Sequence, residues 1–290
     1  MISFFLTPPV SLAAACAGLA LSSPAAAQAP ASIPSEGEGT VYDGDWLSVG
    51  AGVLYGPSYD GSDDYVITPA PIIQGEIGGV GISPRPAGFA LDFVPNPDEG
   101  VGFALGASFR LRSNRAVKIT DPVVESGGKL KRALEIGPTA GITIPKVLHG
   151  YDSLSFGVDV RWDVLGAHEG MVVAPSMTYF TPLSRGAAVA LTLDAEHGDG
   201  KFMDYYYSVG PDAALATGLP LYQAHAGFTR AGATLIGGVD LNGDLTDGGF
   251  AVVVVGGYSR MLGDAKESPY TSIRGSADQW IGALGLGYTF

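Results

Sequence analysis

The sequence lacks the cysteines that disulfides need and, after its N-terminal stretch, the long apolar runs that membrane-spanning helices need. Its one cysteine, Cys16, lies in the apolar stretch near the N-terminus. After that stretch the chain has no further run of about 20 apolar residues, the length that a membrane-spanning helix needs. A disulfide framework and an ordinary helical membrane protein are therefore both excluded.

Positive charge is also scarce. Lys and Arg number 16 against 29 Asp and Glu, which gives a net charge of −13. A nucleic-acid-binding protein needs a basic face to displace the counterions of the phosphates, so we expect no nucleic-acid partner. What the chain does have is 43 Gly, 13 Tyr and 12 Phe, a composition typical of many short strands joined by tight turns.

The motifs of catalysis and metal binding are missing as well. His168-Glu169 lacks the second histidine of the H-E-x-x-H pattern, and neither a G-x-S-x-G serine nor a phosphate loop is present. The acidic stretches at residues 60–64 and 240–247 favour solvated strand connections, with a calcium loop as the alternative. We therefore expect no cofactor, no metal and no enzymatic activity.

The first 44 residues predict export. Residues 4–21 are apolar and small, and Ala25-Ala26-Ala27 offers an A-x-A cleavage site, so residues 1–27 are expected to be a cleaved Sec-type signal peptide. The alternatives are an uncleaved anchor helix and a lipid anchor at Cys16. Residues 28–44 are rich in Ala, Pro, Ser and Glu and predict a flexible periplasmic segment. The folded domain is expected over residues 45–290.

From Trp46 onward, large apolar residues alternate with small or polar ones, which predicts strands with two different faces. In residues 154–164, the charged Asp159, Arg161 and Asp163 share one face. Burying such charges unpaired in a soluble core would cost on the order of several kcal/mol per ion, whereas a polar lumen can hold them. The predicted lumen charges are Arg110, Arg112, Glu135, Asp159, Arg161, Asp163 and Asp194.

Segments of about 9 to 11 residues fit strands that cross a membrane at a tilt. Regular alternation covers residues 47–55, 101–112, 134–144, 154–164, 171–179, 189–195, 222–228, 250–258 and 280–290. Less regular segments occupy residues 65–74, 89–94, 205–209 and 233–241, and the run Val252 to Val255 interrupts alternation. The fold class is therefore all-β, a single antiparallel transmembrane β-barrel of about twelve strands, with ten or fourteen as alternatives.

The last segment carries a further signal. Trp280, Leu284, Leu286, Tyr288 and Phe290 share one face that runs to a C-terminal phenylalanine. This resembles the terminal strand that bacterial outer-membrane barrels present to their assembly machinery. Tyr288 and Phe290 are accordingly predicted to form the assembly signal. The predicted partners are that machinery and the lipid of a Gram-negative outer membrane.

Several loop segments are similar to those of the MipA/OmpV family of outer-membrane proteins. They are residues 56–65, 69–71, 166–170, 203–209, 218–222 and 260–269. The resemblance spans residues 46–290 and departs from the family pattern at Glu169 and at Tyr206-Tyr207. The loop positions that carry the family motifs are Tyr59, Gly61, Asp63, Asp64, Tyr65, Gly263, Asp264, Ser268 and Pro269.

The family resemblance implies a barrel without enzymatic activity. One member is described as a scaffold that brings a lytic transglycosylase together with a penicillin-binding protein, so peptidoglycan-remodelling enzymes are the implied partners. Other members are regarded as surface antigens, adhesins or permeability proteins. A small channel with a charged lumen and a surface antigen or adhesin are therefore the alternative functions.

The assignment of faces can be tested on one predicted strand. Phe156→Asp places a carboxylate on the predicted lipid face and is expected to impair assembly by about 2 kcal/mol or more. Arg161→Ala changes the lumen face and should disturb lumen packing or electrostatics instead. Urea unfolding of each variant in lipid vesicles measures both effects, and equal tolerance of the two changes would refute the assignment.

Overall fold

The computed structural model describes residues 39–95 and 100–290. The expected signal peptide, residues 1–27, lies outside the described residues, as do residues 28–38 of the expected periplasmic segment. Residues 39–44 form a turn against the barrel, where the Val41 N–H donates to the Thr246 carbonyl over 2.9 Å. The Tyr42 ring meets the Trp46 ring edge-on, with 4.8 Å between the centroids.

The described chain closes into one twelve-stranded antiparallel barrel, which confirms the predicted fold class. Each strand pairs with the next along the chain, and β1 pairs with β12 with Ser48 opposite Thr289. The strands are β1 (Trp46–Pro57), β2 (Tyr65–Ile77), β3 (Val80–Arg85), β4 (Gly88–Asp92), β5 (Gly102–Arg112), β6 (Ala133–Pro145), β7 (Ser153–Asp163), β8 (Met171–Ser184), β9 (Ala187–Gly198), β10 (Gly227–Asp240), β11 (Gly249–Met261) and β12 (Asp278–Thr289).

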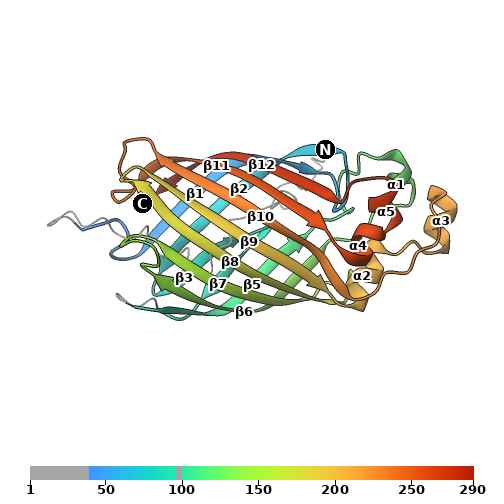
Figure 1. Ribbon diagram of the computed structural model, residues 1–290, viewed down its shortest axis with the longest axis horizontal. Coiled ribbons are helices and arrows are strands. Elements are labelled where there is room, and N and C mark those ends of the chain that lie inside the picture. The colour runs from blue at the N-terminus through green and yellow to red at the C-terminus, as the bar shows by residue number, and fades with distance from the viewer. Residues whose placement is uncertain (1–38, 96–99) are drawn as a thin grey trace, which may run out of the picture.

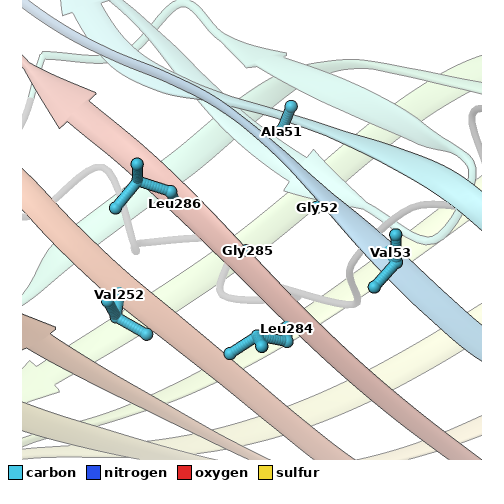
Figure 2. A pocket seen from close by; sticks show the side chains of 7 residues that line it. All are labelled: Ala51, Gly52, Val53, Val252, Leu284, Gly285 and Leu286. Carbon is cyan, nitrogen blue, oxygen red and sulfur yellow. The ribbon is translucent and has the colours of Figure 1, made fainter.

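Side chains alternate between an apolar outer surface and the barrel interior. On β5, Phe103 and Leu105 are exposed on the outside, whereas Ser108 and Arg112 are buried. Figure 2 shows part of the outer surface at the seam of the barrel, where small and branched apolar residues line a groove over β1, β11 and β12. This surface suits the hydrocarbon layer of a membrane.

The two ends of the barrel differ (Figure 1). At the end that holds the C-terminus, strands are joined by short connections such as Gly78-Gly79 and Arg185-Gly186. The opposite end carries the helices α1 (Pro122–Ser126), α2 (Gly200–Tyr207), α3 (Pro211–Thr217), α4 (Gly263–Glu267) and α5 (Pro269–Ser272). We refer to these as the turn end and the helix end.

Within residues 39–95 and 100–290, none of the helices has the length and apolarity that a membrane crossing requires.

The helix α2 shows that the strand predicted at residues 205–209 is wrong. Asp199 caps the helix by accepting the Phe202 N–H over 2.9 Å, and Phe202 and Tyr206, four residues apart, are buried on one face. The five-residue segment was too short to separate a helical turn from a strand. The segment at 222–228 is also largely a connection, since Tyr222 pairs only with Val209 and β10 begins at Gly227.

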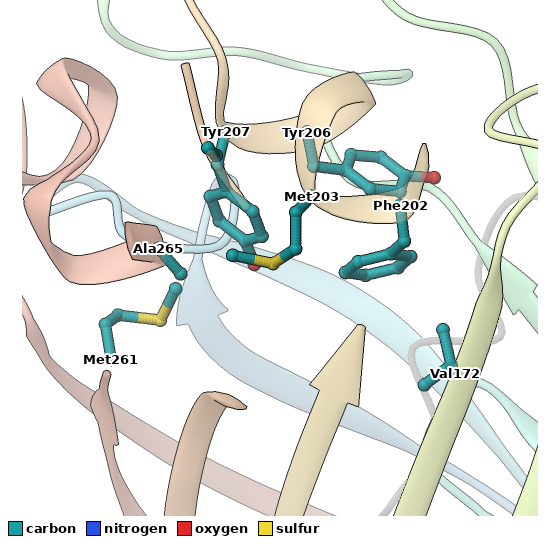
Figure 3. Close-up of a cluster of buried hydrophobic side chains, with 8 residues drawn as sticks. Val172, Phe202, Met203, Tyr206, Tyr207, Met261 and Ala265 are labelled. Atoms are coloured by element: carbon teal, nitrogen blue, oxygen red, sulfur yellow. The ribbon is translucent and has the colours of Figure 1, made fainter. Parts of the chain in front are cut away.

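Buried apolar side chains pack together at the helix end, as Figure 3 shows. The cluster joins α2 to the ends of β8 and β11 and to α4, so the loop after β9 is packed against distant strands. Its buried members are Val172, Phe202, Met203, Tyr206, Tyr207, Ala224, Met261 and Ala265.

The two loops that hold most of the predicted family-motif positions meet at the helix end. The buried Tyr59 hydroxyl donates to the carbonyls of Tyr270 and Arg274 over 3.2 and 3.1 Å, and burial raises the Tyr59 pKa. Gly61 has a φ of +95°, and a Cβ there would collide with Thr271. The β1–β2 loop therefore packs closely against α5.

The remaining predicted motif positions lie around this contact. Ser268 donates its hydroxyl to the Tyr207 carbonyl over 2.7 Å, and Pro269 begins α5. Gly263 begins α4, where Asp264 accepts from the backbone N–H of His225 over 2.8 Å. Asp63 and Asp64 lie in the β1–β2 loop next to Tyr65, the first residue of β2.

Asp121 connects the β5–β6 loop to the segment that follows α5. Its carboxylate accepts the N–H groups of Val123 and Val124 over 2.8 and 2.9 Å, which caps α1. It also accepts from the Arg274 guanidinium over 2.7 Å. Burial by itself would raise the pKa of Asp121, but the Val124 N–H and Arg274 outweigh it and hold the pKa below its ordinary value.

This depressed pKa predicts an acid-sensitive loop. The contribution of Asp121 is complete above its unfolded pKa of about 3.9 and is lost as the pH falls through the lower folded value. We expect the amide-exchange protection factors of Val123 and Val124 to fall in that acidic range. Asp121→Asn should lower protection at neutral pH and remove its pH dependence; the same acid profile in both proteins would contradict the assignment.

Candidate functional site: the lumen charge network

Charged side chains gather inside the barrel toward the helix end. They come from inward-facing positions of β3, β5, β6, β7 and β9 and from the β7–β8 loop, because alternate residues of each strand face the interior. We call this group the lumen charge network. It consists of Arg85, Arg110, Arg112, Glu135, Asp159, Arg161, His168 and Glu196.

Glu196 joins β9 to β5 across the interior. Its carboxylate lies 2.5 Å from Arg110 Nη1 and 2.8 Å from Arg112 Nη2. Three strands, β6, β7 and β8, separate β5 from β9 in the wall. These ion pairs therefore do not follow the wall but cross part of the lumen.

A second crossing joins β3 to β7. Arg85 Nε lies 3.1 Å from Asp159 Oδ2, although β4, β5 and β6 lie between the two strands. The same carboxylate accepts from Arg161 over 2.7 Å and from the hydroxyls of Thr139 and Ser108 over 2.6 and 3.1 Å. Asp159 therefore has partners from four different strands.

Glu135 connects the β5–β9 ion pairs to the β3–β7 ion pair. It is fully buried, with a relative exposure of 0%. Its oxygens lie 2.5 Å from Arg112 Nε, 3.4 Å from Arg161 Nε and 3.3 Å from His168 Nε2. Because an unpaired buried carboxylate is very unfavourable, these contacts are what allow Glu135 to remain in the interior.

The network is covered by α2 at the helix end. The guanidinium carbon of Arg112 lies 4.7 Å from the ring centroid of Phe202 and 5.8 Å from that of Tyr206. Both distances suit a cation–π contact. Arg112 also approaches Asp60 of the β1–β2 loop within 3.7 Å, so a motif loop reaches the network directly.

The structure brings together most of the predicted lumen charges. Arg110, Arg112, Glu135, Asp159 and Arg161 all belong to the network.

Two predicted lumen charges lie apart from it. Asp163 accepts the backbone N–H groups of Leu165, Ala167, His168 and Glu169, and so organises the β7–β8 loop. Asp194 is a quarter exposed and lies 3.8 Å from Arg230.

Sequence reasoning missed Arg85, His168 and Glu196. Glu196 follows Thr192 and Asp194 in the inward register of β9, and extending the predicted strand by one residue would have found it. Arg85 lies on β3, a six-residue strand containing Pro84 that alternation did not reveal. His168 was considered only as a zinc ligand, and nothing local in the sequence indicates its contact with Glu135.

The arrangement is suited to holding strands together. Each of its carboxylates contacts at least two cationic or potentially cationic side chains, so charge is compensated locally. In the part of the chain that the structure describes, no group of three or more His, Cys, Asp or Glu side chains is placed to hold a metal ion.

A family model described as MltA-interacting protein MipA matches residues 49–290. No curated protein matches the chain.

Three similar solved structures are outer-membrane proteins. An outer membrane channel from Pseudomonas putida F1 is 13% identical, with a TM-score of 0.45 over 89% of this chain and 100% of that one. OprD from Pseudomonas aeruginosa is 11% identical, with a TM-score of 0.35 over 84% and 65%. DcaP of Acinetobacter baumannii is 11% identical, with a TM-score of 0.30 over 85% and 95%.

Removing one member of the network should be costly. Glu196→Ala leaves Arg110 without its ion-pair partner and Arg112 with Glu135 and the more distant Asp60, and we expect a loss of about 3 kcal/mol or more in the free energy of unfolding. Asp194→Ala is the matched control on the same inner face of β9, and its partly exposed pair should contribute at most about 1 kcal/mol. Urea unfolding in lipid vesicles measures both values. Similar losses for the two variants would contradict the structural role of the network.

Proposed function

Because the chain belongs to the MltA-interacting protein MipA family, we propose that it is a non-enzymatic outer-membrane barrel that holds peptidoglycan-remodelling enzymes at the membrane. The family description names the partner MltA, a lytic transglycosylase. A penicillin-binding protein is the second partner in this proposal, and an N-terminal signal peptide delivers the chain to the outer membrane.

The observation that carries this proposal is the pair of ion-pair crossings inside the lumen. A channel for polar solutes needs a continuous aqueous path, whereas Arg110 and Arg112 on β5 reach Glu196 on β9 and the network is covered by α2. Side chains therefore fill the part of the cross-section between β3 and β9 toward the helix end. This favours a barrel that supports docking over one that conducts solutes.

The turn end is the surface proposed to face the enzymes. Outer-membrane barrels have short turns on the periplasmic side and longer loops outside, and here the helices occupy the long connections. Tyr288 and Phe290, near the turn end of β12, are proposed to serve as the assembly signal.

The β6–β7 turn is preorganised at this surface. Buried Asp152 accepts the N–H groups of Val147 and Leu148 over 2.7 and 2.9 Å, and the Tyr179 hydroxyl donates to it over 2.8 Å. The turn is thereby fixed with Leu148 at 77% exposure. Fixing a turn before binding lowers the entropy lost when a partner docks.

A co-purification experiment tests the docking role. Full-length protein extracted in detergent should retain a lytic transglycosylase, and Leu148→Asp should reduce the recovered enzyme about tenfold, since a contact loss of about 1.4 kcal/mol gives that factor. Leu215→Asp is the matched control, because Leu215 is 86% exposed on α3 at the opposite end. It should leave recovery unchanged.

The channel alternative predicts a different result. The charged side chains of the lumen favour it, and a channel would give stable single-channel conductance in planar bilayers with the purified wild-type protein. Failure to recover any lytic transglycosylase, together with such conductance, would replace the docking proposal with the channel.

A further inference from the structure

Four cations lie at the surface of the helix end, around the start of β6 and the start of α2. Most other arginines belong to the lumen charge network or pair closely with a carboxylate, as Arg260 pairs with Asp278 over 2.6 Å. The four surface cations have no such close partner. We call them the basic rim. It consists of Lys129, Lys131, Arg132 and Lys201.

Tyr205 brings α2 against the segment that precedes β6. Its hydroxyl accepts the Lys131 N–H over 2.8 Å. Lys201 lies four residues before Tyr205, so both side chains project from the same face of α2. Leu130 packs against the buried apolar cluster of the helix end, and Lys129 and Lys131 on either side of it are exposed. The two segments therefore hold the basic rim together on one side of the barrel.

Arg132 lies just beyond the surface that faces lipid. Ala133 faces inward with 0% exposure and Leu134 faces outward, so alternation places Arg132 on the outer face. On the neighbouring strand β7, Trp162 is 45% exposed and lies opposite Ile136. Tryptophans on the outside of barrels form girdles at the boundary between membrane and water. Arg132 lies two outward positions beyond Ile136, at the level expected for lipid headgroups.

The Arg132 guanidinium is free to bind a ligand. In the described ranges 39–95 and 100–290, no hydrogen bond or ion pair engages it, and the residue is partly exposed. A guanidinium presents its N–H donors in a planar fork that matches two oxygens of a phosphate. Arg132 can therefore hold a phosphate without giving up a contact within the protein.

The carboxylates that contact the basic rim do so loosely. Glu125 lies 4.0 Å from Lys129, and Glu169 lies 3.9 Å from Lys201. All four side chains are more than half exposed, and exposed pairs of this kind contribute little. The basic rim holds four cations against these two carboxylates, an excess of two positive charges. A phosphate monoester carries a charge of about −1.5 to −2 near neutral pH, which matches this excess.

We propose that the basic rim binds the phosphate monoester of a lipid headgroup in the outer leaflet of the membrane. Arg132 donates to two phosphate oxygens, and Lys131 and Lys201 supply further positive charge. The acyl chains of the same lipid lie along the apolar outer surface over Trp162 and Ile136. The choice of leaflet rests on the orientation proposed above, in which the helix end faces outward; the binding itself is independent of the docking role of the turn end.

Lipid retention by the purified full chain tests this site. The protein in detergent micelles is titrated with phosphatidic acid, whose headgroup is a phosphate monoester, and native mass spectrometry counts the bound lipids. We expect an affinity about tenfold higher than for phosphatidylcholine, whose headgroup has no net charge. Arg132→Gln should lower the affinity for phosphatidic acid about tenfold, because the bidentate contact is lost.

Three further variants separate binding from folding. Glu169→Gln removes the carboxylate beside Lys201 and should raise the affinity about twofold, a gain that a damaged barrel cannot produce. Lys201→Gln leaves β6 unchanged and should lower the affinity about threefold. Lys266→Gln removes the same charge from α4, next to β11, and should leave the affinity unchanged. Equal losses for Arg132→Gln, Lys201→Gln and Lys266→Gln would overturn the proposal, because they would indicate general attraction to positive charge.

Inorganic phosphate distinguishes a lipid from a free ion. An excess of about tenfold over phosphatidic acid should leave the bound lipid in place, because its acyl chains remain against the apolar outer surface. Complete displacement would assign a free phosphate ion and overturn the lipid site. Equal retention of phosphatidic acid and phosphatidylcholine would likewise overturn it, since the apolar surface alone would then account for binding.

Discussion

The ion pairs that cross the lumen from β5 to β9 and from β3 to β7 constrain the whole barrel, because each partner is buried and needs the other. Glu196 reaches two arginines on β5, and Asp159 reaches Arg85 on β3. A one-residue slip of any of these strands would turn its charge toward lipid. The network therefore fixes strand register as well as the shape of the cross-section.

This constraint extends into the loops at the helix end. Only three residues separate Glu196 from the first residue of α2, and that helix supplies the rings that cover Arg112. Asp60 links the β1–β2 loop to the same arginine, and Tyr59 links that loop to the segment around α5. Loops from opposite ends of the sequence therefore meet beside the lumen charge network.

Much of the architecture follows from two-residue periodicity. The inward placement of Arg110, Glu135 and Arg161 could be predicted because alternation assigns each side chain to a face. Alternation does not indicate which strand lies across the lumen, so the partners of Glu196 could not be derived. The sequence did not predict the short strand β3 or the helix α2, because segments this short carry too little periodic signal.

Apolar residues that face the barrel interior are also difficult to assign to a face from the sequence. The run Val252 to Val255 interrupts the alternation of polarity, yet Val255 is buried inside the barrel beside Ile236 while Val254 is exposed outside. Both faces of β11 are apolar at this level, so hydropathy could not separate them. The interior is divided into a charged side and an apolar side, and only the charged side has a clear signal in the sequence.

The most direct measurement of the central claim is a double-mutant cycle between the two sides of the lumen. Arg112→Met, Glu196→Gln and the double variant would be compared by equilibrium unfolding in lipid vesicles. Direct contact across the interior predicts a coupling free energy of about 1 kcal/mol or more. Additive effects of the two substitutions would contradict an ion pair that spans the lumen.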